Sequence, residues 1–250
     1  MIDALERERY LRQIAIEGFG EAGQERLSRA RVLVAGAGGL GCPVCTYLTA
    51  AGIGTLRVVD RGEVELSNLN RQVLYGTHDI GEAKSPAVQT RLRDLNPAVH
   101  IEAIHALITM ESIPALLEGM DLVVDALDNL PTRYLVNKAC LEKGIPLVHG
   151  AVRGFQGQAM TVIPGRGPCL MCLFGGVEHT GLIPVLGTAP GIVGCIQATE
   201  TIKILTGMGI PLLGRLLLFD GLDMRFSEFE VARNPSCPHC GDQAAGASAP

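Results

Sequence analysis

A glycine-rich turn followed by a downstream acid is the first feature of this sequence that could do chemistry. The turn, GAGGLG, follows the apolar run at residues 32–35, and Asp60 ends the next apolar run at residues 55–59. Between a strand and a helix, such glycines permit a tight turn and let backbone N–H groups approach a phosphate, while an acid after the second strand can bind ribose hydroxyls. The pattern predicts a nucleotide site without naming the nucleotide. Its glycines are Gly36, Gly38, Gly39 and Gly41.

Basic and amide side chains follow in the polar segment SNLNRQ. Asn68 and Arg71 are three residues apart, so on one helical turn they would face the same side and could both reach phosphates. An equally consistent interpretation is a capped surface helix with Ser67 or Asn68 as its N-cap. Lys84 falls in the first turn of a helix predicted over residues 80–95, where the helix dipole favours anions. A lysine at this position is unfavourable to the helix, and this cost indicates an anionic ligand nearby.

Asp128 and Asn129 follow a strand predicted over residues 121–125. Open α/β sheets bind ligands at the carboxyl ends of their strands, so Asp128 is a candidate Mg²⁺ ligand. It could also be the N-cap of the helix predicted over residues 131–143, and one residue can serve both purposes. His149 ends the following strand, and because no nucleophile stands beside it we expect a packed side chain.

Two CxxC pairs, far apart in the sequence, give a strong metal signal. Two such pairs can supply four thiolates to one tetrahedral Zn²⁺. The alternatives are four unrelated thiols or a redox pair, but redox chemistry needs one pair at a helix N-terminus. The predicted zinc ligands are Cys169, Cys172, Cys237 and Cys240. The other cysteines lie on apolar helix faces and are predicted to be small core residues; they are Cys42, Cys45, Cys140 and Cys195.

The elements that must position these residues alternate between strands and helices up to residue 150. The predicted strands are 32–35, 55–59, 99–104, 121–125 and 145–149, and the predicted helices are 40–51, 80–95, 113–117 and 131–143. This order is typical of an α/β, Rossmann-like, doubly wound and mainly parallel sheet. Beyond residue 150 the pattern predicts antiparallel strands at 158–163, 215–219 and 225–231, a helix at 191–205 and a zinc knuckle built from the four cysteines. Two short helices are predicted within residues 1–30.

Composition and charge exclude several classes of protein. The chain is 47% hydrophobic with 31 glycines, as suits a tightly wound parallel sheet, and its formal net charge of -5 leaves no basic surface for nucleic acid. The N-terminus is charged and lacks an export signal, and no stretch approaches the roughly 20 apolar residues of a membrane span. We therefore expect a cytoplasmic protein that binds neither nucleic acid nor membrane.

Together these motifs resemble the MoeB/ThiF/HesA family of adenylyltransferases, the bacterial relatives of ubiquitin-activating enzymes. The resemblance runs from about Tyr10 to Cys240, and it includes Arg12 within RYLRQ, the glycine loop, Asp60, SNLNRQ, Lys84 within GEAKS, Asp128-Asn129, both CxxC pairs and GCIQATETIKIL. It implies a single adenylyltransferase domain over residues 1–240, with an N-terminal arm at 1–30, a nucleotide-binding half at 31–150 and a carrier-binding and zinc half at 151–240. Residues 241–250 are expected to form a disordered tail.

The resemblance implies that the chain uses ATP and Mg²⁺ to adenylate the C-terminal glycine of a small ubiquitin-like sulfur-carrier protein ending in Gly-Gly. Asp60 would bind the ribose, and Asp128 would hold Mg²⁺. The phosphates would be held by Asn68, Arg71 and Lys84, with Gln72 and Asn129 also in the nucleotide site. Arg12 is a solvated surface arginine by composition alone, but the resemblance places it in the active site of the other subunit of a homodimer. The implied catalytic residues are Arg12, Arg71, Lys84 and Asp128.

The sequence departs from the family pattern at two positions. Gly62 stands where many relatives carry a second acid, and Thr180 stands where many carry the cysteine used for thioester or persulfide chemistry. We therefore expect no covalent link to the carrier; external sulfide or a persulfide would give a thiocarboxylate, and an amine would give an amide. Two alternatives stay open: an NAD-dependent oxidoreductase with the same glycine pattern, and a non-catalytic ATP-binding adaptor.

Overall fold

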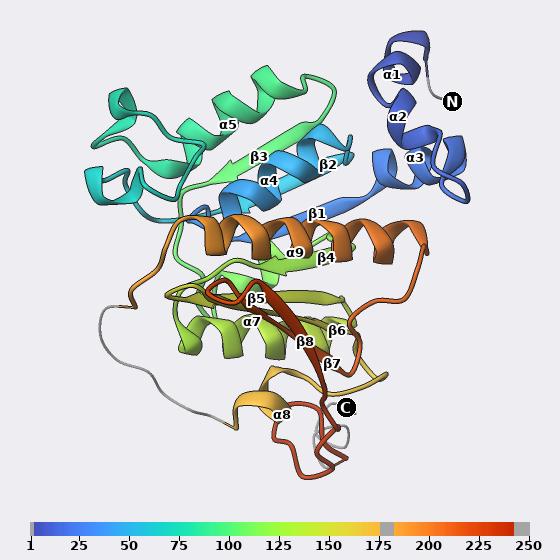
Figure 1. Cartoon of the computed structure of the whole chain (residues 1–250), viewed down its shortest axis with the longest axis vertical. Coiled ribbons are helices and arrows are strands. Elements are labelled where there is room, and N and C mark those ends of the chain that lie inside the picture. The colour runs from blue at the N-terminus through green and yellow to red at the C-terminus, as the bar shows by residue number, and fades with distance from the viewer. Residues whose placement is uncertain (1–2, 176–182, 243–250) are drawn as a thin grey trace.

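The computed structural model describes residues 3–175 and 183–242, so Thr180 lies outside the described residues. Within these ranges, one eight-stranded sheet has the order β3-β2-β1-β4-β5-β6-β7-β8 (Figure 1). β1 to β5 pair in parallel, and β6 to β8 extend the sheet with antiparallel pairing. This confirms the predicted α/β fold, with its mainly parallel sheet and antiparallel C-terminal extension.

The strand order places β1 beside β4, where the doubly wound sheet changes winding direction. The strands are β1 (Arg31–Ala35), β2 (Thr55–Val59), β3 (His100–Ile104), β4 (Leu122–Asp125), β5 (Leu147–Arg153), β6 (Gln156–Val162), β7 (Arg215–Asp220) and β8 (Arg225–Glu230). Ala35 of β1 pairs with Asp125 of β4. The loops that follow these two strands are therefore neighbours, and such a switch point is where open sheets bind ligands.

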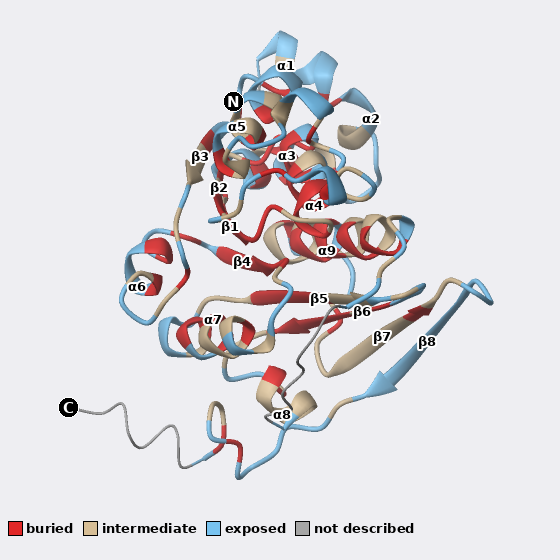
Figure 2. Cartoon of the chain, turned by 90° about the vertical axis from the view of Figure 1, so that its left-hand side faces the viewer, coloured by how far each residue is buried: buried red, intermediate tan, exposed pale blue. Residues whose placement is uncertain are grey.

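Helices cover both faces of the sheet because successive strand residues point to opposite sides. Val32 and Val34 face one helical layer, whereas Leu33 and Ala35 face the other. The first layer contains α4 (Gly41–Ala50), α5 (Lys84–Leu95) and α9 (Thr188–Thr206), and the second contains α6 (Ile113–Leu116), α7 (Leu130–Lys143) and α8 (Leu170–Phe174). Figure 2 shows that β1 and β4 are buried between these layers, whereas β8 is exposed at the edge of the sheet.

Three helices precede β1 in place of the two predicted. They are α1 (Ala4–Arg9), α2 (Leu11–Ile14) and α3 (Gly20–Arg29). Asp3 caps the first helix by accepting a hydrogen bond from Glu6 N at 2.8 Å. The chain breaks between α2 and α3 at Gly18, whose φ of 80° is a backbone conformation that favours glycine.

Other element boundaries also differ from the prediction. The helix expected over residues 80–95 begins at Lys84, because residues 77–79 form a separate 3₁₀ turn and Gly81 has φ 90°. β5 continues to Arg153 as the partner of β6, beyond the predicted end at His149. At the end of the described chain, Gly241 N donates to Cys237 O at 2.8 Å, so the knuckle extends into the first residues of the expected tail.

Among the helices that the structure describes, none combines the length and the apolar character needed to cross a bilayer.

The close packing of the glycine loop predicts a stability defect for Gly41→Ala. A Cβ at Gly41 would stand 2.0 Å from Gly36 O, whereas a Cβ at Gly191 in α9 would meet nothing within 4 Å. We expect Gly41→Ala to lose about 1–3 kcal/mol of unfolding free energy through overpacking. Gly191→Ala should be neutral or stabilising by up to about 1 kcal/mol, since alanine favours helix. Denaturant unfolding of both variants measures this, and equal midpoints would contradict the close-packing argument.

Candidate functional site

A cleft with a volume of about 1210 Å³ opens at the carboxyl ends of the parallel strands. Its wall includes the glycine loop after β1, the segment after β2 and the loop after β4. Most of the sequence-predicted nucleotide residues line it, namely Gly36, Gly38, Gly39, Asp60, Arg71, Gln72, Lys84, Asp128 and Asn129. The strand order therefore gathers residues that are spread over much of the first half of the chain.

The glycine loop is shaped by backbone contacts. Gly36 has φ 100°, and a Cβ there would stand 2.7 Å from Ala126 O in the loop after β4. Gly41 does not line the cleft but begins α4, where it packs against Gly36 O. No side chain caps α4, so the N-terminal end of that helix presents backbone N–H groups beside Gly38 and Gly39. Such an end suits a phosphate, as the sequence predicted.

Asp60 is held in place by the backbone around it. Its Oδ2 accepts a hydrogen bond from Ala37 N at 2.8 Å, and its Oδ1 accepts one from Gly62 N at 2.6 Å. A Cβ at Gly62 would lie 3.0 Å from Asp60 Oδ1 and 3.3 Å from Lys84 Nζ. Gly62 thus keeps an open space between the carboxylate and the ammonium group, where a larger side chain would contact both.

Two cations of the cleft, Arg71 and Lys84, have no acidic partner. Within the described part of the chain neither side chain forms an ion pair. Arg71 NH1 donates to Ser67 O at 2.8 Å, which leaves other guanidinium donors available. Lys84 is the first residue of α5, and the N-cap Ala83 offers no capping side chain. An anion bound in the cleft could form ion pairs with both side chains.

The two amide side chains near Arg71, those of Asn68 and Gln72, differ in whether they line the cleft. Asn68 is buried and does not line the cleft; its Oδ1 accepts from Glu65 N at 3.2 Å and so supports the 3₁₀ turn Leu66–Asn68. Gln72 does line the cleft and is buried, and within the described residues its Oε1 accepts no hydrogen bond. A buried amide oxygen without a donor is rare in proteins, so it suits a ligand that donates.

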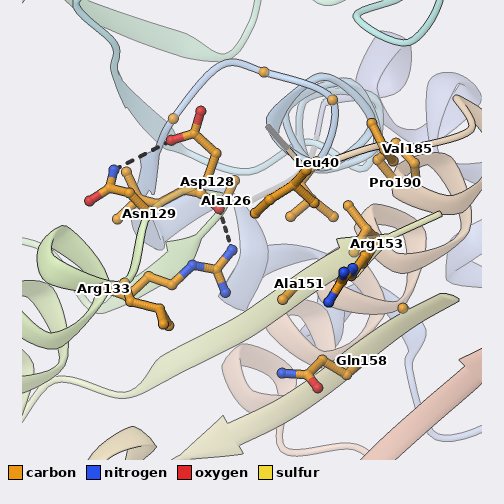
Figure 3. A pocket seen from close by; sticks show the side chains of 18 of the residues that line it. Leu40, Ala126, Asp128, Asn129, Arg133, Ala151, Arg153, Gln158, Val185 and Pro190 are labelled. Carbon is orange, nitrogen blue, oxygen red and sulfur yellow. Dashed lines mark hydrogen bonds between the residues drawn. The ribbon is translucent and has the colours of Figure 1, made fainter. Parts of the chain in front are cut away.

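Asp128 lies exposed at the rim of the cleft (Figure 3). The N-cap of α7 is its neighbour Asn129, whose Oδ1 accepts from Thr132 N at 3.0 Å. Asp128 is therefore not needed for capping, and among the residues described its Oδ1 receives only a long contact of 3.4 Å from Asn129 Nδ2. Its carboxylate is available to a cation, as expected for a Mg²⁺ ligand.

Beneath this rim lies a buried polar cluster that sequence reasoning missed. His149 Nδ1 is 2.7 Å from Asp125 Oδ2, and Arg133 NH1 is 3.6 Å from the same oxygen. Burial raises the pKa of Asp125, but the nearby Arg133 and His149 outweigh it and hold that pKa below its usual value. Burial lowers the pKa of His149 and outweighs the opposing effect of Asp125. The histidine is packed, as predicted, and its lowered pKa favours the neutral form at neutral pH.

The four predicted zinc ligands converge between α8 and the chain after β8. The Sγ atoms all lie within 4.8 Å of one another, with Cys169 to Cys237 at 3.7 Å and Cys172 to Cys240 at 3.4 Å. Tetrahedral Zn²⁺ with Zn–S bonds of about 2.3 Å needs sulfur atoms roughly 3.8 Å apart. The cluster fits that ion and has no open position for water, so it suits a structural metal centre.

Cys195 differs from the other cysteines outside this cluster. Cys42, Cys45 and Cys140 are buried, as predicted, but Cys195 is only half-buried in α9. It lines a shallow apolar groove of about 530 Å³ with Ile192 and Phe226, on the other side of β8 from the cleft. The prediction of a buried core thiol was wrong here because the exposed β8 only partly covers this stretch of α9.

Arg12 lies away from the cleft. It is exposed in α2, and the adjacent Gln13 bonds to Ala51 O at the C-terminal end of α4. That end of α4 precedes β2 and so lies at the amino edge of the parallel sheet, opposite to the cleft. Within one chain, Arg12 does not line the cleft.

The fold and the cleft define the class: an α/β protein that can bind a nucleotide at the switch point of its sheet. The chain belongs to the ThiF family, whose family model matches residues 10–239.

Some relatives match this chain over almost the full length of both proteins. The sulfur carrier protein adenylyltransferase of Thermus thermophilus is 49% identical over 249 residues, covering 95% of this chain and 92% of that protein. The SAMP-activating enzyme E1 of Haloferax volcanii is 47% identical over 247 residues, covering 96% of this chain and 91% of that protein. The adenylyltransferase and sulfurtransferase MOCS3 of Mus musculus is 43% identical, and the match covers 94% of this chain but 53% of that protein.

Solved structures show the same fold. A structure of E. coli MccB with MccA-N7isoASN superposes with a TM-score of 0.85 at 21% identity, covering 94% of this chain and 75% of that chain. A structure of PaaA superposes with a TM-score of 0.79 at 25% identity, covering 93% of this chain and 75% of that chain.

The sulfur geometry predicts one zinc ion per chain. We expect Cys237→Ser to lose zinc and stability, because three thiolates bind the ion more weakly than four. A loss of about 2 kcal/mol would lower the unfolding temperature by roughly 4–8 °C at this chain length. Elemental analysis and thermal unfolding of protein purified without chelator measure both effects. Cys195→Ser, outside the cluster, should keep its zinc; native protein without zinc would refute the site.

Proposed function

We propose that this chain is an adenylyltransferase that uses ATP and Mg²⁺ to activate the C-terminal glycine of a small ubiquitin-like sulfur-carrier protein. The observation that carries the proposal is the cleft itself, in which two cations that form no ion pair in the described part of the chain, Arg71 and Lys84, line the same cavity as an exposed carboxylate, Asp128. The near full-length relatives, named for adenylyl transfer or for activation of a carrier, support it.

Each group of the cleft has a role in this proposal. Asp60, fixed by two backbone N–H groups, binds the ribose, and the uncapped end of α4 receives phosphate oxygens. Arg71 and Lys84 bind the phosphates, with Gln72 and Asn129 beside them; Asn68 holds the turn from which Arg71 extends. Asp128 would hold Mg²⁺, which neutralises phosphate charge when bound.

The proposed reaction needs positioning and charge stabilisation more than proton transfer. The carrier's C-terminal carboxylate is already ionised at neutral pH, so it can attack the α-phosphorus without a general base. Negative charge then builds on the phosphate oxygens and on the departing pyrophosphate. Cations held in place before the reaction stabilise that charge, as Arg71 and Lys84 would do here.

The cleft has room for a carrier tail beside the nucleotide. Its far end is lined by side chains of β5, β6 and β8, among them Arg153, Gln158 and Phe229. Arg153 and Gln158 lie across the cleft from Asp128 (Figure 3). A flexible glycine tail entering there would bring its carboxylate toward the phosphates.

We propose that the acyl-adenylate is released to an external nucleophile and not to an enzyme thiol. The family's cysteine position is Thr180, outside the described residues, and a threonine hydroxyl has no usable ionised fraction at neutral pH. Cys195 lies in the groove on the other side of β8 from the cleft, and burial raises its pKa. Sulfide displacing AMP would give a thiocarboxylate directly. A persulfide displacing AMP would give an acyl disulfide, from which a second thiol would release the thiocarboxylate by forming a disulfide with the donor, and an amine displacing AMP would give an amide. We place this ATP-dependent reaction in the cytoplasm.

The two alternative functions have less support. None of the relatives described above is named an oxidoreductase, so nothing beyond the glycine loop and Asp60 favours NAD chemistry. A non-catalytic adaptor would not require the cations and the acid that meet in the cleft.

Carrier-dependent exchange of pyrophosphate into ATP tests the proposed function. We expect exchange with the native chain and a fall of about 10²-fold or more for Lys84→Ala and Asp128→Asn, because each removes a group that stabilises transition-state charge. Lys138→Ala is the matched control, since Lys138 is exposed on α7 and pairs with Glu142 away from the cleft.

Binding of NAD(H) without ATP, or full activity in the Lys84 and Asp128 variants, would refute the function. The same reaction, analysed by denaturing mass spectrometry without reductant, should show enzyme of unchanged mass. A carrier adduct abolished by Cys195→Ala would overturn the external-nucleophile step alone.

We also propose a homodimer in which Arg12 of one chain completes the cleft of the other. Arg12 is exposed at the opposite edge of the sheet from the cleft of its own chain, so it can act only from a second subunit. Mixing Arg12→Ala with Lys84→Ala should then restore about a quarter of the native activity, because each mixed dimer keeps one intact site. Chain exchange verified by mass spectrometry without any recovery would show that Arg12 does not act in trans.

A further inference from the structure

The proposed reaction gives no role to the buried cluster beneath Asp128. Asp125 and His149 are fully buried, and Arg133 is 5% exposed. They come from three elements, the end of β4, the middle of β5 and the first half of α7. Replacing a buried ion pair by apolar side chains is often neutral or stabilising, so stability alone does not explain a charged pair here.

The directional bonds of the cluster converge on one residue of the cleft loop. Asp125 Oδ1 accepts from Leu127 N at 3.1 Å, and Arg133 NH2 donates to Leu127 O. The backbone of Leu127 is thus held at both its N–H and its C=O by charged groups that are themselves paired. Figure 3 shows Arg133 reaching from α7 toward the strand end that carries Ala126 and Asp128. The next residue after Leu127 is Asp128.

Side chains of α9, β6 and α8 hold the cluster in place. Gln197 of α9 donates to Asp125 O at 2.7 Å, and Gln158 Nε2 lies 3.3 Å from His149 Nε2. Since His149 is neutral, Nδ1–H donates to Asp125 and Nε2 accepts from Gln158. Phe174 of α8 packs edge-on against the imidazole with ring centroids 5.5 Å apart. No part of the cluster can shift without breaking a buried bond.

We propose that Arg133, Asp125 and His149 are positioning residues that set the place of the Asp128 carboxylate through the backbone of Leu127. This rests on the proposed function, in which Asp128 holds Mg²⁺. Loss of a group that orients a metal ligand typically costs about 10- to 100-fold in metal affinity or activity. Arg133 also lines the cleft, but it is only 5% exposed and its guanidinium bonds to Leu127 O, so the proposal assigns its effect to the placement of Asp128 and not to contact with substrate.

The test is the Mg²⁺ dependence of two measurements in Arg133→Lys: ATP binding without carrier, followed by calorimetry, and carrier-dependent pyrophosphate exchange. Lysine keeps the buried positive charge but lacks the fork that reaches both Asp125 and Leu127 O. We expect the half-saturating Mg²⁺ concentration to rise roughly 10- to 100-fold with the KM for carrier unchanged. Excess Mg²⁺ should recover part of kcat. Lys138→Met, which removes an exposed cation from the same helix, should keep the native dependence.

A second variant keeps the test decisive if Arg133→Lys does not fold. The double variant Asp125→Asn with Arg133→Met removes both charges together, so neither is left buried and unpaired. It should fold, as circular dichroism and thermal unfolding would show, and should have the same raised Mg²⁺ requirement. A folded double variant with the native Mg²⁺ requirement would overturn the positioning role.

Asp128→Asn separates this inference from the proposed function. If Asp128→Asn itself keeps the native Mg²⁺ response, the role of Asp128 in the proposed function is wrong. If Asp128→Asn loses that response while Arg133→Lys keeps it, only the positioning role is wrong. A raised KM for ATP with native Mg²⁺ dependence in Arg133→Lys would show that Arg133 binds the nucleotide directly, and would also overturn the positioning role.

Discussion

The site depends on the parallel pairing of β1 with β4. Ala126 N donates to Ala35 O at 3.0 Å, so the loops after the two strands leave the sheet side by side. Glycine at position 36 then lets the first loop lie against Ala126 O, where any side chain would collide with the backbone. The glycine turn and a carboxylate distant in sequence are thereby held by backbone hydrogen bonds and not by flexible side chains.

Charge is distributed unevenly around that pairing. Two of the cations that line the cleft, Arg71 and Lys84, form no ion pair within the described residues, whereas the buried Arg133 is paired with Asp125. Arg71 and Lys84 are only half-buried, so water still solvates them and they can exchange that water for an anionic ligand. A buried cation has no such alternative and needs a fixed partner. The two kinds of cation therefore suit different tasks, binding at the surface and support beneath it.

The sequence was sufficient for the sheet, the glycine loop and the cysteine cluster, because each depends on local pattern or fixed spacing. It was not sufficient for the Arg133 cluster, whose members come from separate elements and meet only when β4 and β5 pair. The partial exposure of Cys195 could not be predicted from the sequence either, because it depends on how far β8 covers α9. Asn129 could have been recognised as the N-cap, because it directly precedes Leu130 and Pro131 at the start of α7 and asparagine is a preferred cap.

The position of α9 means that the core of the first half of the chain is completed only late in synthesis. This helix belongs to the second half of the sequence, yet its Val193 and Ala198 pack in the same core as Val34 of β1 and Val124 of β4. When only the first half has left the ribosome, that apolar surface of the sheet lacks one of its covering helices. A nascent chain of that length exposes part of its future core to water, and such exposed surfaces are what chaperones bind.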